Sequence, residues 1–152
     1  LYYCRDAVGV GIDISIEALK IAEENGQNLK ITDRVEWRQG DYLKAFDEED
    51  IFDGIFSNPP YIPTKDIGGL SREVKHEPRL ALDGGTDGLY FYHLLAKGAA
   101  EHLKPGGFLA VEFGIGQATD ILEMFRKSAQ YEDFEVIKDY GGIKRALYCR
   151  KK

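Results

Sequence analysis

Four consecutive residues, Asn58-Pro59-Pro60-Tyr61, could together hold a planar NH₂ group. Asn58 offers a side-chain amide oxygen as a hydrogen-bond acceptor. The two prolines fix φ and remove backbone donors, so that their carbonyl oxygens remain available as acceptors. Tyr61 adds a flat aromatic ring. Two acceptors and a flat ring match the two hydrogens and the plane of a side-chain amide or of an exocyclic base amine. An ordinary Asn-Pro turn is the alternative.

The tetrapeptide directly follows Ile51–Ser57, a mostly apolar run that predicts a buried strand. Two consecutive prolines cannot continue a central strand, because neither donates to the ladder. Ligands of open α/β sheets bind at the carboxyl ends of the strands. We therefore expect the tetrapeptide to stand where the chemistry takes place.

Two acidic residues stand at the ends of earlier strands, Asp13 before Ile14-Ser15 and Asp41 before Tyr42. Asp13 could accept hydrogen bonds from ribose hydroxyls, and Asp41 or a neighbouring backbone group could receive an adenine amino group. We expect Ile14 and Tyr42 to line the same cofactor. Each aspartate alone could be a turn residue, but two of them on successive strands favour a nucleoside site.

A nucleoside site also needs a glycine-rich turn about 20 residues before the ribose acid. Counting back from Asp13 passes the start of the chain, and Gly9-Val10-Gly11 lies inside the predicted strand rather than at a helix start. We therefore expect the first strand and its glycine loop to be missing, and residues 1–152 to form a single, N-terminally truncated catalytic domain.

The elements that position these residues alternate between strands and helices, which predicts an α/β fold with a mostly parallel sheet and a C-terminal antiparallel hairpin. Ser15 is a candidate N-cap, Gly26 a helix end, and Pro105-Gly106-Gly107 the break after the next long helix. The expected strands are 7–14, 34–39, 51–57, 108–113, 134–138 and 146–149, and the later helices are 89–103 and 119–129. Between Tyr61 and Gly88 we expect a long functional loop.

Composition narrows the function classes. Lys plus Arg is 20 and Asp plus Glu is 26, a net charge of −6, which argues against a domain that binds mainly nucleic-acid phosphates. We expect no metal site, because Asp47–Asp50 is typical of a solvated loop and the two cysteines lack zinc spacing. No apolar run reaches the ~18 residues of a membrane span, and no signal peptide is recognisable. A cytoplasmic protein is the expectation.

The motif Asn58–Tyr61, with Asp13 and Asp41 upstream, resembles the amino-directed methyltransferases that use S-adenosylmethionine. The later segment, Glu77–Leu82 with Gly84-Gly85, Asp87-Gly88-Leu89 and Phe91-Tyr92, is similar to the protein-glutamine N5-methyltransferases of the HemK/PrmC type. These enzymes modify the glutamine of a Gly-Gly-Gln loop in peptide-chain release factors. The resemblance extends from about Ala7 onward. It implies a Rossmann-like, class I S-adenosylmethionine-dependent methyltransferase fold and a release factor as partner, with no nucleic acid or membrane required.

The resemblance also implies residue roles. Asn58, Pro59, Pro60 and Tyr61 would be catalytic through positioning and electrostatics, with Asn58 also next to the cofactor. Glu77 and Pro78 would form a substrate loop, although Glu77 could instead cap a helix or pair with Arg79 or Arg72.

Three other functions stay open. The first is a nucleic-acid methyltransferase acting on adenine N6 or guanine N2. The second is a ribosomal-protein glutamine methyltransferase. The third is a fragment that keeps the scaffold but binds no cofactor.

Overall fold

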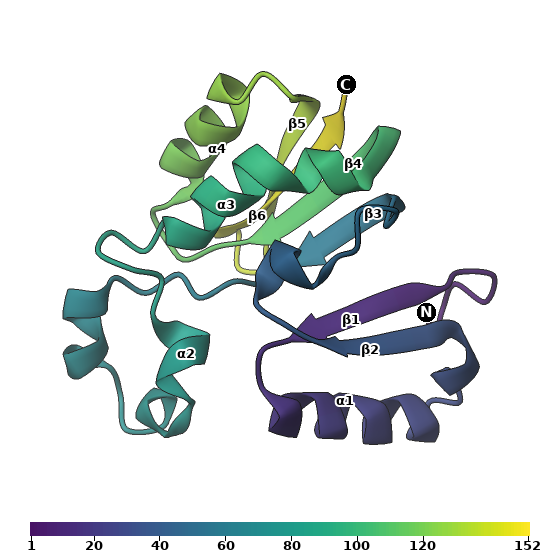
Figure 1. Cartoon of the computed structure of the whole chain (residues 1–152). Helices are drawn as coiled ribbons and strands as arrows, with labels where there is room; N and C mark the ends of the chain where they lie inside the picture. The colour runs from purple at the N-terminus through teal and green to yellow at the C-terminus, as the bar shows by residue number, and fades with distance from the viewer. The chain divides into compact units, whose positions relative to one another are not determined.

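The computed structural model describes residues 1–152, which form two compact units, unit 1 with residues 1–50 and unit 2 with residues 51–152. Both units combine strands and helices, as the alternating pattern predicted (Figure 1). None of the helices has the length and apolar character that a membrane crossing requires.

Unit 1 is a strand–helix–strand motif. Strands β1 (Gly9–Asp13) and β2 (Val35–Gln39) pair in parallel, in a register that sets Asp13 beside Gln39. Parallel strands need a crossover connection, which is helix α1 (Ile16–Asn28). In Figure 1 this helix runs alongside the strand pair. The Ser15 hydroxyl accepts a hydrogen bond from the Ala18 N–H at 3.2 Å, which confirms the predicted N-cap.

The end of α1 differs from the sequence prediction. Gly26 does not end the helix, which continues to Asn28. The left-handed residue that follows the helix is Lys30, with φ +55°. The Ile31 N–H then donates to the Gly26 carbonyl at 3.0 Å. Glycine is the most common residue in this left-handed conformation after a helix, but here Lys30 adopts it. The prediction that the helix ends at Gly26 is therefore wrong.

Unit 2 is a four-stranded mixed sheet in the order β3-β4-β6-β5. Its strands are β3 (Phe52–Ser57), β4 (Leu103–Glu112), β5 (Tyr131–Lys138) and β6 (Lys144–Lys151). β3 and β4 are parallel, whereas β6 is antiparallel to both β4 and β5, which confirms the predicted terminal hairpin.

Helices α3 (Tyr90–Gly98) and α4 (Ala118–Lys127) lie on one face of this sheet (Figure 1). The core of unit 2 consists of buried apolar side chains from these helices and from the strands. Among the most completely buried are Leu95, Leu109, Val111, Ile121, Phe125 and Leu147. The packed layer fixes where β3 and β4 end, and those ends position the candidate site.

The break predicted at Pro105-Gly106-Gly107 is wrong. α3 ends at Gly98, a 3₁₀ turn covers Ala99–His102, and β4 already begins at Leu103. The pairing with β3 shifts between Phe52↔Leu103 and Gly54↔Phe108, so the extra residues form an irregularity within β4. Such bulges carry residues that are unsuited to a regular ladder.

Candidate active site

The motif Asn58–Tyr61 begins directly where β3 ends at Ser57. Asn58 is exposed, and its side chain forms no hydrogen bond with the protein. Pro59 is buried, and Pro60 and Tyr61 are half-buried. The Pro59 and Pro60 carbonyl oxygens accept no hydrogen bond from the rest of the chain. The motif therefore carries a rigid set of acceptors that are not committed elsewhere.

A cavity of about 330 Å³ lies beside Asn58. Its walls come from the ends of β3 and β4 and from β6, namely Phe56, Ser57, Asn58, Ala110, Val111, Glu112 and Ala146. The Tyr92 hydroxyl donates to the Glu112 carbonyl at 2.7 Å and so fixes the end of β4. Asn58 thus borders a concave surface at the carboxyl edge of the sheet, the edge where the sequence predicted it.

Three glycines leave room for the motif. A Cβ at Gly84 would lie 2.8 Å from the Pro60 carbonyl oxygen, and one at Gly88 would lie 2.4 Å from the Tyr61 carbonyl oxygen. A Cβ at Gly114 would lie 2.9 Å from the Tyr61 ring. Since real Cβ atoms do not approach other atoms this closely, only glycine fits at these positions without a shift of the motif.

The Gln117 side chain connects the same segments. Its Oε1 accepts from the Gly114 N–H at 2.9 Å, and its Nε2 donates to the carbonyls of Tyr61 at 3.0 Å and Gly88 at 3.2 Å. Sequence analysis did not single out Gln117, because a lone glutamine whose partners are distant in the chain forms no recognisable motif.

Residues 64–82, after the motif, form a long loop that we call the excursion loop. The chain segments at its two ends are hydrogen-bonded to each other. The Ile62 N–H donates to the Leu82 carbonyl at 3.0 Å, and the Thr64 N–H donates to the Gly85 carbonyl at 2.9 Å. Asp83 also joins the two ends of the loop, because its Oδ1 accepts from the Thr64 hydroxyl at 2.6 Å. Hydrogen bonds from Thr64, from the Gly85 N–H and from Arg79 lower the pKa of Asp83.

Glu77 and Pro78 lie on the excursion loop, and both are exposed. The structure does not show the expected alternative pairing of Glu77 with Arg79, because Arg79 forms an ion pair with Asp83 at 3.2 Å. The Glu77 N–H donates to the Val74 carbonyl at 3.0 Å, but its carboxylate has no partner within the protein. Its carboxylate is therefore available to a ligand from outside the chain.

In unit 1, the structure brings Asp13 and Ile14 together with the end of β2. The Gly40 N–H donates to the Asp13 carbonyl at 3.1 Å, and the Gln39 Nε2 donates to the Ile14 carbonyl at 3.2 Å. The Asp13 side chain is exposed, with Oδ1 accepting from the Ser15 N–H at 2.8 Å. Its Oδ2 has no partner within the protein and remains a free acceptor.

Asp41 and Tyr42 follow β2, separated from its last residue by Gly40. Asp41 is exposed, and its Oδ2 accepts from the Lys44 ammonium at 2.6 Å. Tyr42 is half-buried and has φ +61°, an uncommon conformation for a tyrosine. The carboxylates of Asp13 and Asp41 are acceptors, which is the chemistry needed to bind ribose hydroxyls and an amino group.

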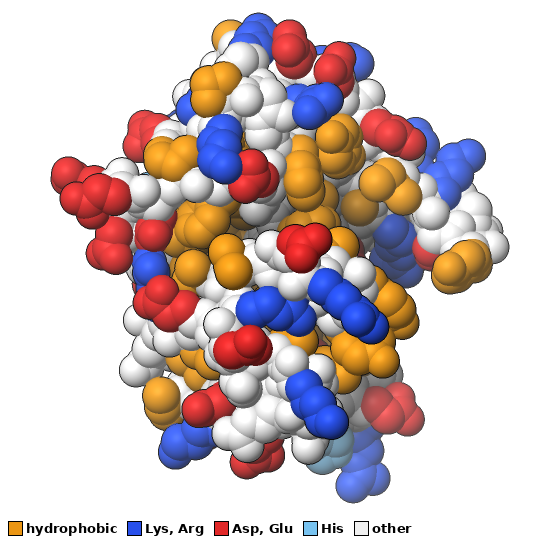
Figure 2. Space-filling model, turned by 90° about the vertical axis from the view of Figure 1, so that its right-hand side faces the viewer, with side chains coloured by type: hydrophobic (Ala, Val, Ile, Leu, Met, Phe, Trp, Pro, Cys, Tyr) orange, Lys and Arg blue, Asp and Glu red, His pale blue; other side chains and the backbone are white.

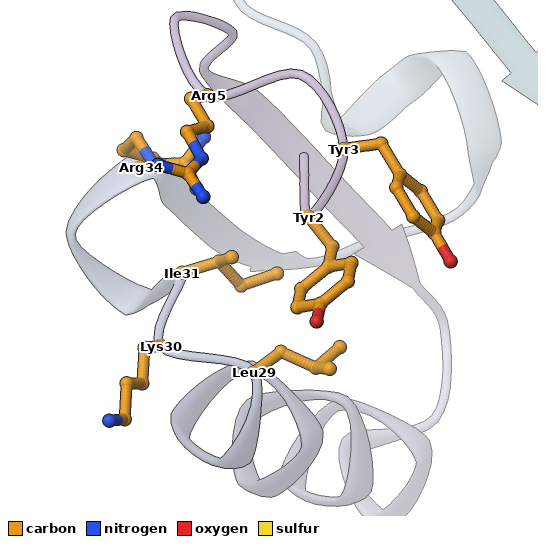
Figure 3. Close-up of a pocket in the computed structure, with 7 residues that line it drawn as sticks. All are labelled: Tyr2, Tyr3, Arg5, Leu29, Lys30, Ile31 and Arg34. Atoms are coloured by element: carbon orange, nitrogen blue, oxygen red, sulfur yellow. The ribbon is translucent and has the colours of Figure 1, made fainter.

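Another cavity, of about 580 Å³, lies in unit 1, beside the end of α1 and the N-terminal segment (Figure 3). In Figure 3 the Tyr2 ring points toward Leu29 and Ile31, and Arg5 and Arg34 approach each other. The remaining lining residues are Tyr3 and Lys30. The Arg34 Nη1 donates to the carbonyls of Leu1, Cys4 and Ala7 at 3.2, 3.1 and 3.1 Å. None of the predicted site residues lines this cavity. The three hydrogen bonds of Arg34 hold the N-terminal segment in place.

Charged side chains of both signs are interspersed on the face shown in Figure 2. This face carries no continuous basic surface of the kind that nucleic-acid binding favours. The acidic run at 47–50 contributes to an ion-pair cluster, in which Arg38 contacts Asp47 at 3.4 Å and also pairs with Asp50. No group of three His, Cys, Asp or Glu side chains is placed to hold a metal ion.

The comparisons with known proteins find similarity to methyltransferases. Residues 4–66 match a family model described as "RMKL-like, methyltransferase domain". The chain is 42% identical to the release factor glutamine methyltransferase of Moorella thermoacetica over 99% of its own length. It is 47% identical to the one from Caulobacter vibrioides over 93%. The chain covers 53% and 48% of these two relatives, so it spans about half the length of the curated proteins it matches.

Solved structures confirm the fold. A methyltransferase from Pyrococcus furiosus superposes with a TM-score of 0.67 at 24% identity, over 93% of this chain and 61% of that one. An RNA methyltransferase from Salinibacter ruber, in complex with S-adenosyl-L-homocysteine, gives a TM-score of 0.52 at 18% identity, over 95% and 66%. The chain therefore has the Rossmann-like fold of class I methyltransferases that the motifs predicted.

Proposed function

We propose that this chain, a relative of the release factor glutamine methyltransferases over almost its whole length, methylates a glutamine side chain in the Gly-Gly-Gln loop of a peptide-chain release factor. The observation that carries the proposal is the set of uncommitted acceptors at Asn58 and Pro59, beside a cavity at the carboxyl edge of the sheet. The names of the relatives from Moorella and Caulobacter supply the substrate class.

S-adenosylmethionine is the proposed cofactor, and it supplies an electrophilic methyl group when bound. The acceptors of unit 1 fit such a nucleoside. The Asp13 carboxylate, with its free Oδ2, would accept hydrogen bonds from the ribose hydroxyls, next to Ile14. Asp41 and the backbone of Tyr42 would hold the adenine.

The motif would activate the substrate by position rather than by removing a proton. An amide nitrogen is a poor nucleophile, because its lone pair is delocalised into the carbonyl group. The Asn58 side-chain oxygen and the Pro59 carbonyl would accept its two N–H bonds, which orients the nitrogen and stabilises the positive charge that develops on it. Pro60 would keep this geometry rigid, and the Tyr61 ring would pack on the amide plane. The proton would leave after the methyl group has been transferred.

The test is methyl transfer to a purified release factor, measured by mass spectrometry with the full-length protein. We expect Asn58→Ala to lower turnover by about 100-fold or more, the loss typical of removing one preorganised group in a site of this kind. The melting temperature should stay the same, since the exposed Asn58 side chain makes no hydrogen bond. Asn25→Ala, at an exposed position of α1, is the matched control. Near-normal turnover by Asn58→Ala would contradict the mechanism.

The same assay separates the other functions. A methyl group found only on adenine or guanine would indicate a nucleic-acid enzyme, which the two curated relatives named above do not favour. A methyl group on a ribosomal-protein glutamine would change the partner but not the chemistry. The absence of binding heat with S-adenosylmethionine would show that the protein keeps only the scaffold.

A further inference from the structure

We propose that Gln117 is a positioning residue for the methyl-transfer step. Its side chain holds the Pro60–Tyr61 backbone in place through a hydrogen bond to the Tyr61 carbonyl. This inference rests on the proposed function, because it assigns to Gln117 a role in placing the acceptors of the motif. Gln117 itself does not touch the substrate in this proposal.

The side chain of Gln117 hydrogen-bonds to backbone groups through both its oxygen and its nitrogen. Its oxygen accepts from the Gly114 N–H at 2.9 Å, two residues after the end of β4. Its nitrogen donates to the Tyr61 carbonyl at 3.0 Å and to the Gly88 carbonyl at 3.2 Å. One amide thus joins three segments that are far apart in sequence, namely the turn before α4, the motif, and the chain that returns from the excursion loop.

The surrounding backbone shows that this arrangement is tight. A Cβ at Gly88 would lie 2.4 Å from the Tyr61 carbonyl and 2.8 Å from the Gln117 Nε2. A Cβ at Gly114 would lie 3.0 Å from the Gln117 Oε1 and 2.9 Å from the Tyr61 ring. Tyr61 and Gln117 therefore both lie against Gly88 and against Gly114, and neither glycine leaves room for a side chain. A hydrogen bond within such a contact restricts the Tyr61 backbone.

The chemical consequence concerns the direction of the acceptors. Asn58 and Pro59 are fixed on one side by β3, which ends at Ser57. On the other side they are fixed through Tyr61, whose carbonyl accepts from Gln117, and through Ile62, whose N–H donates to the Leu82 carbonyl. Loss of the donor at position 117 would remove the restraint that lies nearer to the acceptors. Catalysis by positioning is sensitive to displacements of about 1 Å, so turnover should fall more than binding.

The experiment compares Gln117→Glu and Gln117→Met with wild type in the full-length protein, with methylation of a release factor as the assay. Both variants keep the length of the side chain, and glutamate keeps an acceptor for the Gly114 N–H but loses the donor. We expect kcat to fall at least 10-fold in both. The Kd for S-adenosylmethionine, from calorimetry, should change less than 2-fold, because Gln117 hydrogen-bonds to none of the proposed cofactor residues.

A pH profile provides a readout that a purely structural role would not move. A protonated glutamate can donate one hydrogen bond to the Tyr61 carbonyl. The activity of Gln117→Glu relative to wild type should therefore rise as the pH falls from 8 to 6, whereas that of Gln117→Met should stay constant. Gln130, whose Nε2 donates to the Lys97 carbonyl at 3.3 Å, supplies the matched controls. Gln130→Glu and Gln130→Met should keep kcat within 2-fold.

The outcomes distinguish the two proposals. If wild type methylates no release factor, the proposed function fails. If wild type is active and both Gln117 variants keep its kcat, the positioning role is wrong and the proposed function stands. A parallel loss of cofactor affinity and melting temperature would also overturn the positioning role. If Gln117→Met does not fold, the pH dependence of Gln117→Glu decides.

Discussion

Two amide side chains show how differently the same chemical group is used at the candidate site. Asn58 makes no hydrogen bond within the protein, whereas Gln117 bonds to three backbone groups. The sequence indicated Asn58 because a buried strand and two prolines locate it at a sheet edge. It gave no indication of Gln117, because the partner Tyr61 lies 56 residues away. Local patterns therefore indicate an exposed polar residue at a strand end better than a side chain that joins segments distant in sequence.

At the scale of the residue, Gly84 offers a steric test of the motif. We expect Gly84→Ala to lower turnover at least 10-fold, since its Cβ would lie 2.8 Å from the Pro60 carbonyl oxygen and 2.9 Å from the Tyr61 Cα. The measurement is the initial rate of release-factor methylation. Gly68→Ala is the control, because no atom lies within 4 Å of the Cβ it would add. Equal rates for the two variants would show that the motif tolerates displacement.

At the scale of the element, local sequence signals predicted a boundary correctly where a single side chain sets it. They failed where pairing with a distant strand sets the boundary. Ser15 caps α1 as predicted, because an N-cap needs only its own side chain and the first helical turn. The sequence Pro105-Gly106-Gly107 predicts a break, yet it lies within β4, whose pairing begins at Phe52↔Leu103. Leu103 was assigned to the preceding helix because its spacing fits an apolar stripe. It is buried at the start of the strand instead.

The cap of α1 also carries a prediction. Ser15→Ala removes the acceptor of the Ala18 N–H and should destabilise the protein by about 1 kcal/mol. Ser15→Asn, which keeps a capping oxygen and adds no charge beside Asp13 and Glu17, should lose much less. The free energy of unfolding from urea titration distinguishes the two variants, and faster hydrogen exchange in the first turn of α1 would locate the effect. An alanine variant as stable as wild type would show that the cap contributes nothing.

At the scale of the whole molecule, the alternation of strands and helices was enough to predict an α/β fold and its terminal hairpin. The roles of Asp13, Ile14, Asp41 and Tyr42 stay predictions, since they concern a cofactor. The order β3-β4-β6-β5 was beyond the sequence, because β6 pairs with β4 across an intervening helix and strand. Apolar periodicity states which residues are buried but not which strands are neighbours.

The core of unit 2 predicts sensitivity to alkaline pH. Burial raises the pKa of the Cys149 thiol to about 12, and burial also raises the pKa of Tyr131. In the unfolded chain the same thiol loses its proton near the ordinary cysteine pKa of 9.0. Above that pH the unfolded state binds fewer protons than the folded state, so stability should fall as pH rises, by at most about 1.4 kcal/mol per pH unit for one group.

Melting temperatures between pH 8 and pH 10.5 test this prediction. We expect a decline that starts near pH 9 in wild type and is shallower in Cys149→Ala, which has no thiol to titrate. Parallel curves for the two proteins would show that Cys149 does not contribute. Exposed Cys4 should react with a thiol reagent in the native protein, and Cys149 only after unfolding.

The hydrogen bonds that join the two ends of the excursion loop separate the placement of Asn58 from the sequence inside the loop. Since Ile62, Thr64 and Asp83 hold the two ends of the loop together where it departs, its interior can change in length or sequence without transmitting strain to Asn58. The substrate contacts proposed for Glu77 and Pro78 could therefore be changed in the outer part of the loop while the motif keeps its place. For an engineer, these residues mark where a foreign peptide-binding segment can be grafted.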